Sequence, residues 1–511
     1  MKISIEFQKG KPLGCPFNGT CLIVSRTTPF VSTKVAKTRF GSLSKNFDSF
    51  LILMVKNRSF SLSSSANATL AVSPAAYEVP FKIPGTPIER QLLHYFYVQA
   101  APDLSGYSSH NFWNNLVLTS CYTEPAVRHA TLALGALHRD YVVEGITKPD
   151  GDRINSNALQ HYNKAIRQLQ KYFSNKELLD KRTVLICCRL FYCIEIARQD
   201  YPTALRHAKS GLNILKDWKD RQDKQPTSNM NSDPACNVNN LVEAWCDFDP
   251  QVRIFENGTP PYLTLTTPEE RSGAISCVPA QFHSLSHAWA VMNKLMNWGF
   301  HFLGSRIEKE QGLPEDTEIG NLSEKEALKE AIDQWPSVFE SFMRSRDSNI
   351  SSLDKESATM CATIHRGTKV LVHLAAGRSL FDLNDDFNDM LNMAESIIRN
   401  YDSKTRHRGF GFETGLVSML WVLAMNCPDP AMRSRAIWVM KVWPRREGLW
   451  DSARISSAVE KAQKFAQSND ALIESPKLRL GSSMKRAGVA PGELYMQLLS
   501  SHPHSWKVEH P

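Results

Sequence analysis

One segment, residues 184–196, is apolar on nearly every side of a helical wheel, and it constrains the fold more than any other. A helix without a polar face has to be surrounded by other elements, so we predict that it is a central, buried helix. From Ile88 onward the apolar residues recur at helical spacing. An alternating strand pattern appears only in the N-terminal tail and over the short run 262–266. The sequence therefore predicts an all-α fold.

Two segments repeat one pattern at an offset of 46 residues. Residues 158–169 read A-L-x-H-x-x-x-A-I-x-x-L, and residues 204–215 read A-L-x-H-x-x-x-G-L-x-x-L. The small side chains of Ala165 and Gly211 suit close approach between helices. The echo predicts antiparallel helical hairpins, although two copies do not establish a solenoid.

Further helices are predicted where the apolar spacing persists. The run Thr123-Glu124-Pro125 is typical of a helix start, since it supplies a capping hydroxyl, an acid and a first-turn proline. Pro102 predicts the end of the helix before it. The remaining helices are expected over 88–101, 126–141, 283–303, 358–379, 387–401, 412–426, 431–442 and 451–467.

Composition divides the chain into three parts. Residues 1–80 are basic and Ser-rich with little periodicity, which predicts a disordered segment. Residues 88–470 form the helical body, and a polar stretch at 216–240 reads as an exposed linker within it. Residues 471–511 are expected to be a C-terminal tail.

The positive charge is concentrated at the N-terminus. Residues 1–75 hold ten Lys or Arg against two acidic residues, and the rest of the chain holds 50 of each sign. The whole formal net charge of +8 therefore lies in this segment. Its basic residues can contact nucleic acid or can simply be solvated. The candidates for nucleic-acid contact are Lys34, Lys37, Arg39 and Lys45.

The cysteines predict neither a disulfide framework nor a metal site. The eleven cysteines are scattered, and no signal peptide is visible at the N-terminus. Cys187, Cys188 and Cys193 have apolar neighbours and read as core residues. Cys15 and Cys21 have no nearby partner, although a tetrahedral structural site needs four ligands. We expect no cofactor, and no apolar run approaches the ~20 residues of a membrane helix.

No catalytic constellation stands out, so the sequence predicts a protein that is not an enzyme. The triplet 138–140 reads His-Arg-Asp as in kinases, but Gly145 stands where a kinase needs asparagine. The glycine-rich run 409–415 reads better as the lead-in to a helix than as a dinucleotide loop. His129, His138, His161 and His207 read as packing or surface residues. A well-formed pocket with convergent polar side chains would reopen the enzyme hypothesis.

Several stretches in a fixed order carry a family resemblance. They are APDLSGY at 101–107, EPAVRHA at 124–130, LGALH at 134–138 and, most specific, PRREGLWD at 444–451. Together they resemble the regulatory domain of fungal zinc-binuclear-cluster transcription factors, in the subfamily of the aspercryptin cluster regulator. The resemblance covers roughly residues 88–470.

The resemblance implies a nuclear regulator of RNA polymerase II transcription, often of a secondary-metabolite gene cluster. It implies DNA, a related transcription factor or proteins of the transcription machinery as partners, and no membrane; it leaves the oligomeric state open. The alternative is a helical scaffold that does not bind DNA.

The resemblance also implies a module of six cysteines that holds two zinc ions and reads DNA, and the sequence departs from the family there. Residues 37–43 look like the basic lead-in to this module, but Ser42 stands where its first cysteine belongs, and no cysteine follows before Cys121. Either the module has been lost or the gene's start and splicing have been read wrongly. The residues of this chain therefore do not supply a zinc cluster with which to bind DNA.

Overall fold

The computed structural model describes residues 84–107, 112–144, 156–174, 180–224, 238–255, 261–310, 322–346, 350–400, 410–412 and 415–468. Within these ranges the protein is built almost wholly from helices, with three strands of two residues each. The predicted all-α fold is confirmed. The predicted disordered segment 1–80 and the C-terminal tail 471–511 lie outside the described residues.

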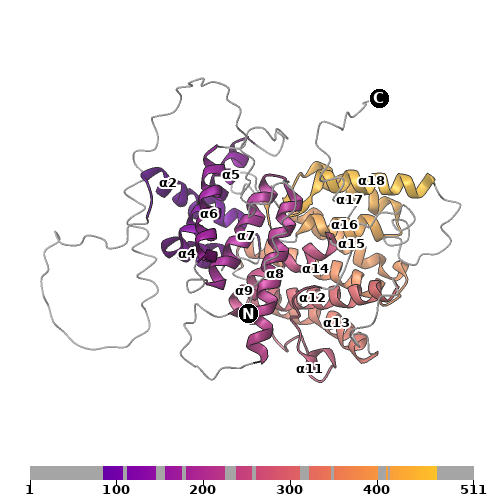
Figure 1. Ribbon diagram of the computed structural model, residues 1–511. Helices are drawn as coiled ribbons and strands as arrows, with labels where there is room; N and C mark the ends of the chain where they lie inside the picture. The colour runs from indigo at the N-terminus through magenta and orange to yellow at the C-terminus, as the bar shows by residue number, and fades with distance from the viewer. Residues whose placement is uncertain are drawn as a thin grey trace, which may run out of the picture.

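The N-terminal group of helices occupies one side of the molecule, drawn in indigo to magenta in Figure 1. It begins with α2, whose last turn runs into a π-helical turn at Phe96–Ala100. Its elements are α2 (Pro87–Tyr95), α3 (Ala101–Leu104), a second π-helical turn (Phe112–Val117), α4 (Leu118–Thr123), α5 (Pro125–Glu144), α6 (Ser156–Ser174), α7 (Lys181–Ala197), α8 (Tyr201–Lys224), α9 (Val238–Trp245) and α10 (Phe248–Phe255).

The C-terminal group occupies the other side, in pink to yellow, and α8 runs between the two groups (Figure 1). Its elements are α11 (Pro268–Arg271), α12 (Leu285–Glu310), α13 (Leu322–Arg344), α14 (Ser352–Ala375), a 3-10 turn (Leu380–Leu383), α15 (Asn384–Arg399), β1 (Phe410–Gly411), α16 (Leu416–Asn426), α17 (Pro430–Val442), β2 (Arg446–Glu447), β3 (Trp450–Asp451) and α18 (Ser452–Ser468). Strand β2 pairs parallel with β1 and antiparallel with β3.

Helix α7 is the buried centre that the sequence predicts. Asp180 caps its N-terminus by accepting hydrogen bonds from two backbone amides, and every residue from Thr183 to Ile196 is buried. The one cation of this buried stretch, Arg189, is fully buried, 3.8 Å from Asp247 and stacked on the rings of Phe112 and Phe248. Helices α5 and α8 pack against α7.

The two echo segments form helices α6 and α8, and each packs against the helix before it, α5 and α7. The predicted antiparallel hairpins are therefore present. Ala165 is fully buried, and Gly211 lies so close to α9 that an added Cβ would stand 2.2 Å from a ring carbon of Trp245. The small residues of the echo serve close helix packing.

The structure corrects the predicted linker at 216–240. Helix α8 continues to Lys224 and α9 begins at Val238, so only 225–237 separates them, and those residues lie outside the described ranges. The polar residues after Leu215 stay helical because they lie on the solvent side of a helix whose other face is anchored by buried Leu215 and by Trp218. Asp217 and Arg221 add an ion pair one turn apart.

Two further details differ from the sequence predictions. Pro102 does not end the helical run, because it lies in the first turn of α3, where its missing N–H removes no hydrogen bond. Helix α13 was not predicted, and it contains Pro336. Its buried Leu328, Ile332 and Phe339 do follow helical spacing.

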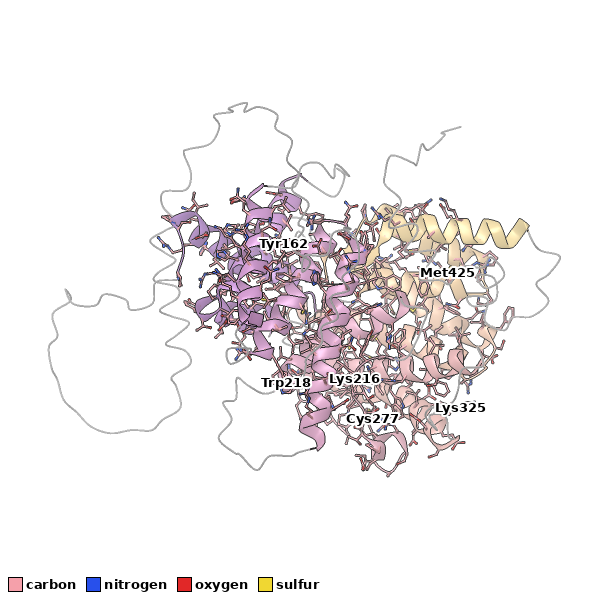
Figure 2. All side chains as sticks on the ribbon, viewed as in Figure 1. Tyr162, Lys216, Trp218, Cys277, Lys325 and Met425 are labelled. Carbon is pink, nitrogen blue, oxygen red and sulfur yellow. The ribbon has the colours of Figure 1, made fainter. Side chains whose placement is uncertain are left out.

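Side chains fill the space between the two groups of helices (Figure 2). Tyr162 lies among the N-terminal helices and Met425 among the C-terminal ones. Among the described residues, no helix is long and apolar enough to cross a membrane.

Candidate functional site

A polar cavity of about 320 Å³ opens where the end of α8 meets the C-terminal group. Lys216, on the described part of α8, is labelled in Figure 2. Basic and acidic side chains face each other across the cavity. The lining residues are Lys216, Lys219, Asp220, Tyr262, Leu263, Thr264, Thr266, Arg271, Trp298, His301 and Glu324.

Buried polar groups fix the irregular segment that forms one wall of this cavity. The carboxylate of Asp249 accepts from the amides of Tyr262 and Leu263 at 2.8 and 2.6 Å. Burial raises the pKa of Asp249 to about 6, although these two hydrogen bonds act in the opposite direction. The Asn297 side chain donates to the carbonyl of Leu263 and accepts from the amide of Leu265. The wall is therefore shaped before any ligand arrives.

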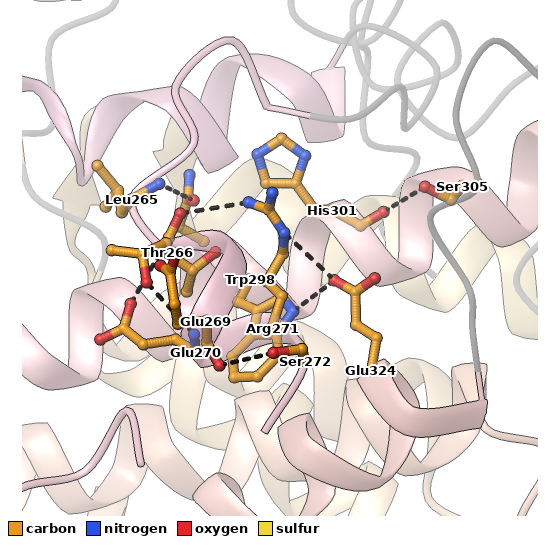
Figure 3. A network of polar contacts seen from close by, with 12 residues as sticks. Leu265, Thr266, Glu269, Glu270, Arg271, Ser272, Trp298, His301, Ser305 and Glu324 are labelled. Carbon is orange, nitrogen blue, oxygen red and sulfur yellow. Dashed lines mark hydrogen bonds and ion pairs between the residues drawn. The ribbon is translucent and has the colours of Figure 1, made fainter. Parts of the chain in front are cut away.

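Three titratable side chains that line the cavity, Arg271, His301 and Glu324, have protein partners, and Figure 3 shows those of Arg271 and Glu324. Glu324 accepts from the indole N–H of Trp298 at 2.9 Å and pairs with Arg271 at 4.0 Å. His301 lies 2.9 Å from the carbonyl of Leu263, and burial lowers its pKa. These contacts hold the polar side chains of Arg271, His301 and Glu324 in fixed positions around the cavity.

The family-specific stretch 444–451 forms a tight hairpin of β2 and β3. Glu447 accepts from the amide of Val417 at 2.8 Å and so caps α16, while Arg445 pairs with the same carboxylate at 2.8 Å. Gly448 adopts a φ of 59°, and an added Cβ would lie 2.9 Å from the Tyr192 hydroxyl. The motif thus joins the C-terminal helices to α7, and its role here is structural.

The histidines that the sequence singles out fall into different environments. His138 lies inside α5, 3.0 Å from the Tyr95 hydroxyl and 3.4 Å from Asp103, so the kinase-like triplet is part of a helix. His207 lies 3.4 Å from the Tyr162 hydroxyl in the core. The Nδ1 atoms of His129 and His161, by contrast, lie 3.3 Å apart, beside the carboxylate of Glu89. Sequence spacing did not predict this last cluster.

The described cysteines are core residues, as predicted. All eight are buried free thiols. Burial raises the pKa of Cys188 to about 12 and holds those of Cys187 and Cys193 well above the ordinary value. These thiols are therefore protonated at neutral pH.

The remaining predicted site residues lie outside the described ranges. They are Cys15 and Cys21, the lead-in with Ser42, and the candidate nucleic-acid contacts Lys34, Lys37, Arg39 and Lys45.

Comparison with known proteins identifies the first part of the helical body. Residues 91–242, from α2 into α9, match the family described as fungal specific transcription factor domain. The chain therefore carries the regulatory domain of a fungal transcription factor. Helices α6, α7 and α8 form the core of this matched region.

Two curated relatives extend the likeness beyond that region. The aspercryptin biosynthesis cluster-specific transcription regulator atnN of Emericella nidulans is 23% identical over 420 residues, covering 66% of this chain and 67% of the relative. The transcription regulator lscL of Purpureocillium lilacinum is 26% identical over 119 residues, covering 22% of this chain and 28% of the relative. No solved structure matches the chain. The chain is a fungal transcription regulator.

Proposed function

We propose that this regulator acts in the nucleus and controls RNA polymerase II transcription of a secondary-metabolite gene cluster. The observation that carries the proposal is the likeness to the cluster-specific regulator of aspercryptin biosynthesis, which spans about two thirds of both chains. The helical body supplies the regulatory surface, and it acts through protein contacts rather than through catalysis. The engaged side chains of the polar cavity support a binding role there.

The proposal assigns sequence-specific DNA recognition to a partner protein. No cysteine occurs between Cys21 and Cys121 in the sequence as printed, so this stretch offers no cysteine array for two zinc ions. The basic residues 1–75 would add weak, sequence-independent attraction to DNA. A related factor that carries the zinc module is the kind of partner that fits.

Deletion of the gene in its own fungus tests the proposal. We expect the transcripts of one contiguous group of biosynthetic genes to change together and to return when the full chain is reintroduced. A strain complemented with Arg189→Ala, which leaves Asp247 buried without its nearest cation, is the matched control and should not restore them. Unchanged transcripts in the deletion strain, or changes spread over unlinked genes, would contradict the proposal.

A further inference from the structure

Three side chains from three separate helices converge at one end of the first helical hairpin. Glu89 comes from the first turn of α2, His129 from α5 and His161 from α6. The Nδ1 atoms of the two imidazoles lie 3.3 Å apart, and Nδ1 of His161 lies 3.9 Å from Oε1 of Glu89. The three ligand atoms all lie within 4.8 Å of one another.

These separations match the first coordination sphere of a small transition cation. A tetrahedral zinc ion bound at about 2.0–2.1 Å places its ligand atoms about 3.3 Å apart. The two imidazoles already meet this spacing, and a small rotation of Glu89 brings its oxygen into range. Two histidines and one carboxylate are a ligand set that leaves a fourth position open for water.

Each member of the cluster is held in place by its neighbours, and the two Nδ1 atoms share a hydrogen bond that a metal ion would replace. Oε2 of Glu89 accepts from the amide of Thr86 at 2.7 Å in a capping box, which leaves Oε1 facing the histidines. The His129 and His161 rings stack with their centroids 5.4 Å apart and their planes 22° apart. His161 is buried and Glu89 is nearly so.

The protonation states suit a cation. Burial lowers the pKa of His129 to about 4 and lowers that of His161 as well, so both imidazoles are neutral at neutral pH. Burial acts to raise the pKa of Glu89, but the amide and hydroxyl of Thr86 and the neighbouring His161 and Lys164 bring it below the ordinary value. A carboxylate and two neutral imidazoles can bind a metal ion without first losing a proton.

One side chain, that of Lys164, opposes the binding of a cation to this cluster. Nζ of Lys164 lies 3.7 Å from Oε1 of Glu89, on the same oxygen that faces the histidines. Its side chain is 49% exposed, so the ammonium can turn into solvent when a cation takes its place. Lys164 therefore competes with the metal ion and tunes its affinity.

We propose that Glu89, His129 and His161 form a binding site for a divalent transition-metal ion, Zn²⁺ in the first instance, with the fourth position taken by water. The spacing of the cysteines predicts no metal site, and it does not bear on these three ligands, which are separated by 40 and 32 residues along the chain. The bound ion links the start of α2 to both helices of the α5–α6 hairpin. This inference is independent of which genes the protein regulates.

Metal binding is measured on the purified full chain with Zn²⁺ alone, by titration against a chromophoric chelator. Co²⁺ is the spectroscopic probe. The site predicts d–d bands of a four- or five-coordinate ion with nitrogen and oxygen ligands, without a thiolate charge-transfer band. A thiolate band would place the ion on cysteines and would overturn the proposal.

Four variants test whether Zn²⁺ binds at this cluster and not at other histidines. We expect Glu89→Gln, His129→Gln and His161→Gln each to lose more than the roughly tenfold to hundredfold in Zn²⁺ affinity that loss of an outer hydrogen-bond partner costs. Lys164→Met should bind Zn²⁺ several-fold more tightly, a gain that a misfolded variant cannot produce. Unchanged affinity across all four variants would overturn the site.

The matched control is the pair His283 and His287, whose rings also stack with centroids 5.4 Å apart but belong to no three-residue ligand group among the described residues. The double variant His283→Gln and His287→Gln should keep its Zn²⁺ affinity. Loss of binding in this control, or a wild-type chain that does not bind Zn²⁺, would refute the proposal. Circular dichroism of each variant without metal shows that the helical fold is intact.

Discussion

His207 and His365 are fully buried in the helical core, and burial lowers the pKa of each to about 4. In the unfolded chain their pKa returns to about 6.5. The unfolded state therefore binds more protons than the folded state below that pH, and stability falls as the pH is lowered. Their contribution is fully present above about pH 6.5 and is lost progressively toward pH 4.

We predict that moving from pH 7 to about pH 5 lowers the free energy of unfolding by about 2 kcal/mol for each of these histidines. Urea unfolding at both pH values measures the loss. His365→Gln keeps a donor for the carbonyl of Ile332 and should reduce the loss by its own share, while His283→Gln at an exposed position should not. Equal pH dependence in all three proteins would contradict the account.

For single residues, the adjacent residues in the sequence determined whether burial and site membership could be predicted. Cys187, Cys188 and Cys193 lie in an apolar run, and their burial follows from that run. The cluster of Glu89, His129 and His161 could not be predicted, because its members meet only when α2 packs beside the α5–α6 hairpin. Nothing in the immediate neighbourhood of each residue indicates the other two.

Close approach of helices depends on single small residues at the contacts. A Cβ at Gly211 would lie 2.2 Å from the Trp245 ring, which is itself fully buried. We predict that Gly211→Ala lowers the free energy of unfolding by about 1–3 kcal/mol, because the ring has to shift within a packed core. Denaturant titration followed by circular dichroism measures the stability.

Gly135→Ala in α5 is the control for this prediction. There an added Cβ meets its nearest neighbour, Phe96, at 3.4 Å, which is an ordinary contact. Alanine is favoured over glycine inside a helix by up to about 1 kcal/mol, so this variant should be as stable as the wild type or more so. If both variants behaved alike, the close α8–α9 contact would not be the cause.

Helical periodicity predicted most elements to within a few residues of their ends, because an amphipathic helix shows its buried stripe in the sequence. It failed where solvent-facing residues dominate, as in the last turns of α8, where Leu215 and Trp218 pack on the core. It also failed at α13, where Pro336 obscured a regular buried stripe. The cavity beneath α8 was not predictable, since its walls come from segments far apart in the chain.

At the scale of the whole molecule, the excess positive charge lies outside the helical body. This separation predicts how the chain binds DNA. The excess of +8 lies in residues 1–75, and the rest of the chain is formally neutral. We predict weak binding without sequence preference, and a slope of log K against log salt of about −3 to −4 if Lys34, Lys37, Arg39 and Lys45 each neutralise one phosphate. Gel-shift titrations at several salt concentrations measure both properties.

Replacing these four basic residues by alanine should abolish most of that slope. The matched control replaces the exposed Lys329, Arg344, Lys355 and Lys441 of the helical body, which is the same number of lysines and arginines. It should leave the slope unchanged. Tight, sequence-specific and salt-tolerant binding by this chain would show that it reads DNA without a partner.

The most direct test of the central claim is nascent transcription after rapid depletion of the tagged protein in its own fungus. Rapid depletion leaves no time for secondary changes in metabolism, so it reports direct action on transcription. The account predicts that nascent transcripts of one contiguous biosynthetic gene group change first and together, while transcripts elsewhere in the genome hold steady. Unchanged nascent transcription of every such group after complete depletion would contradict it.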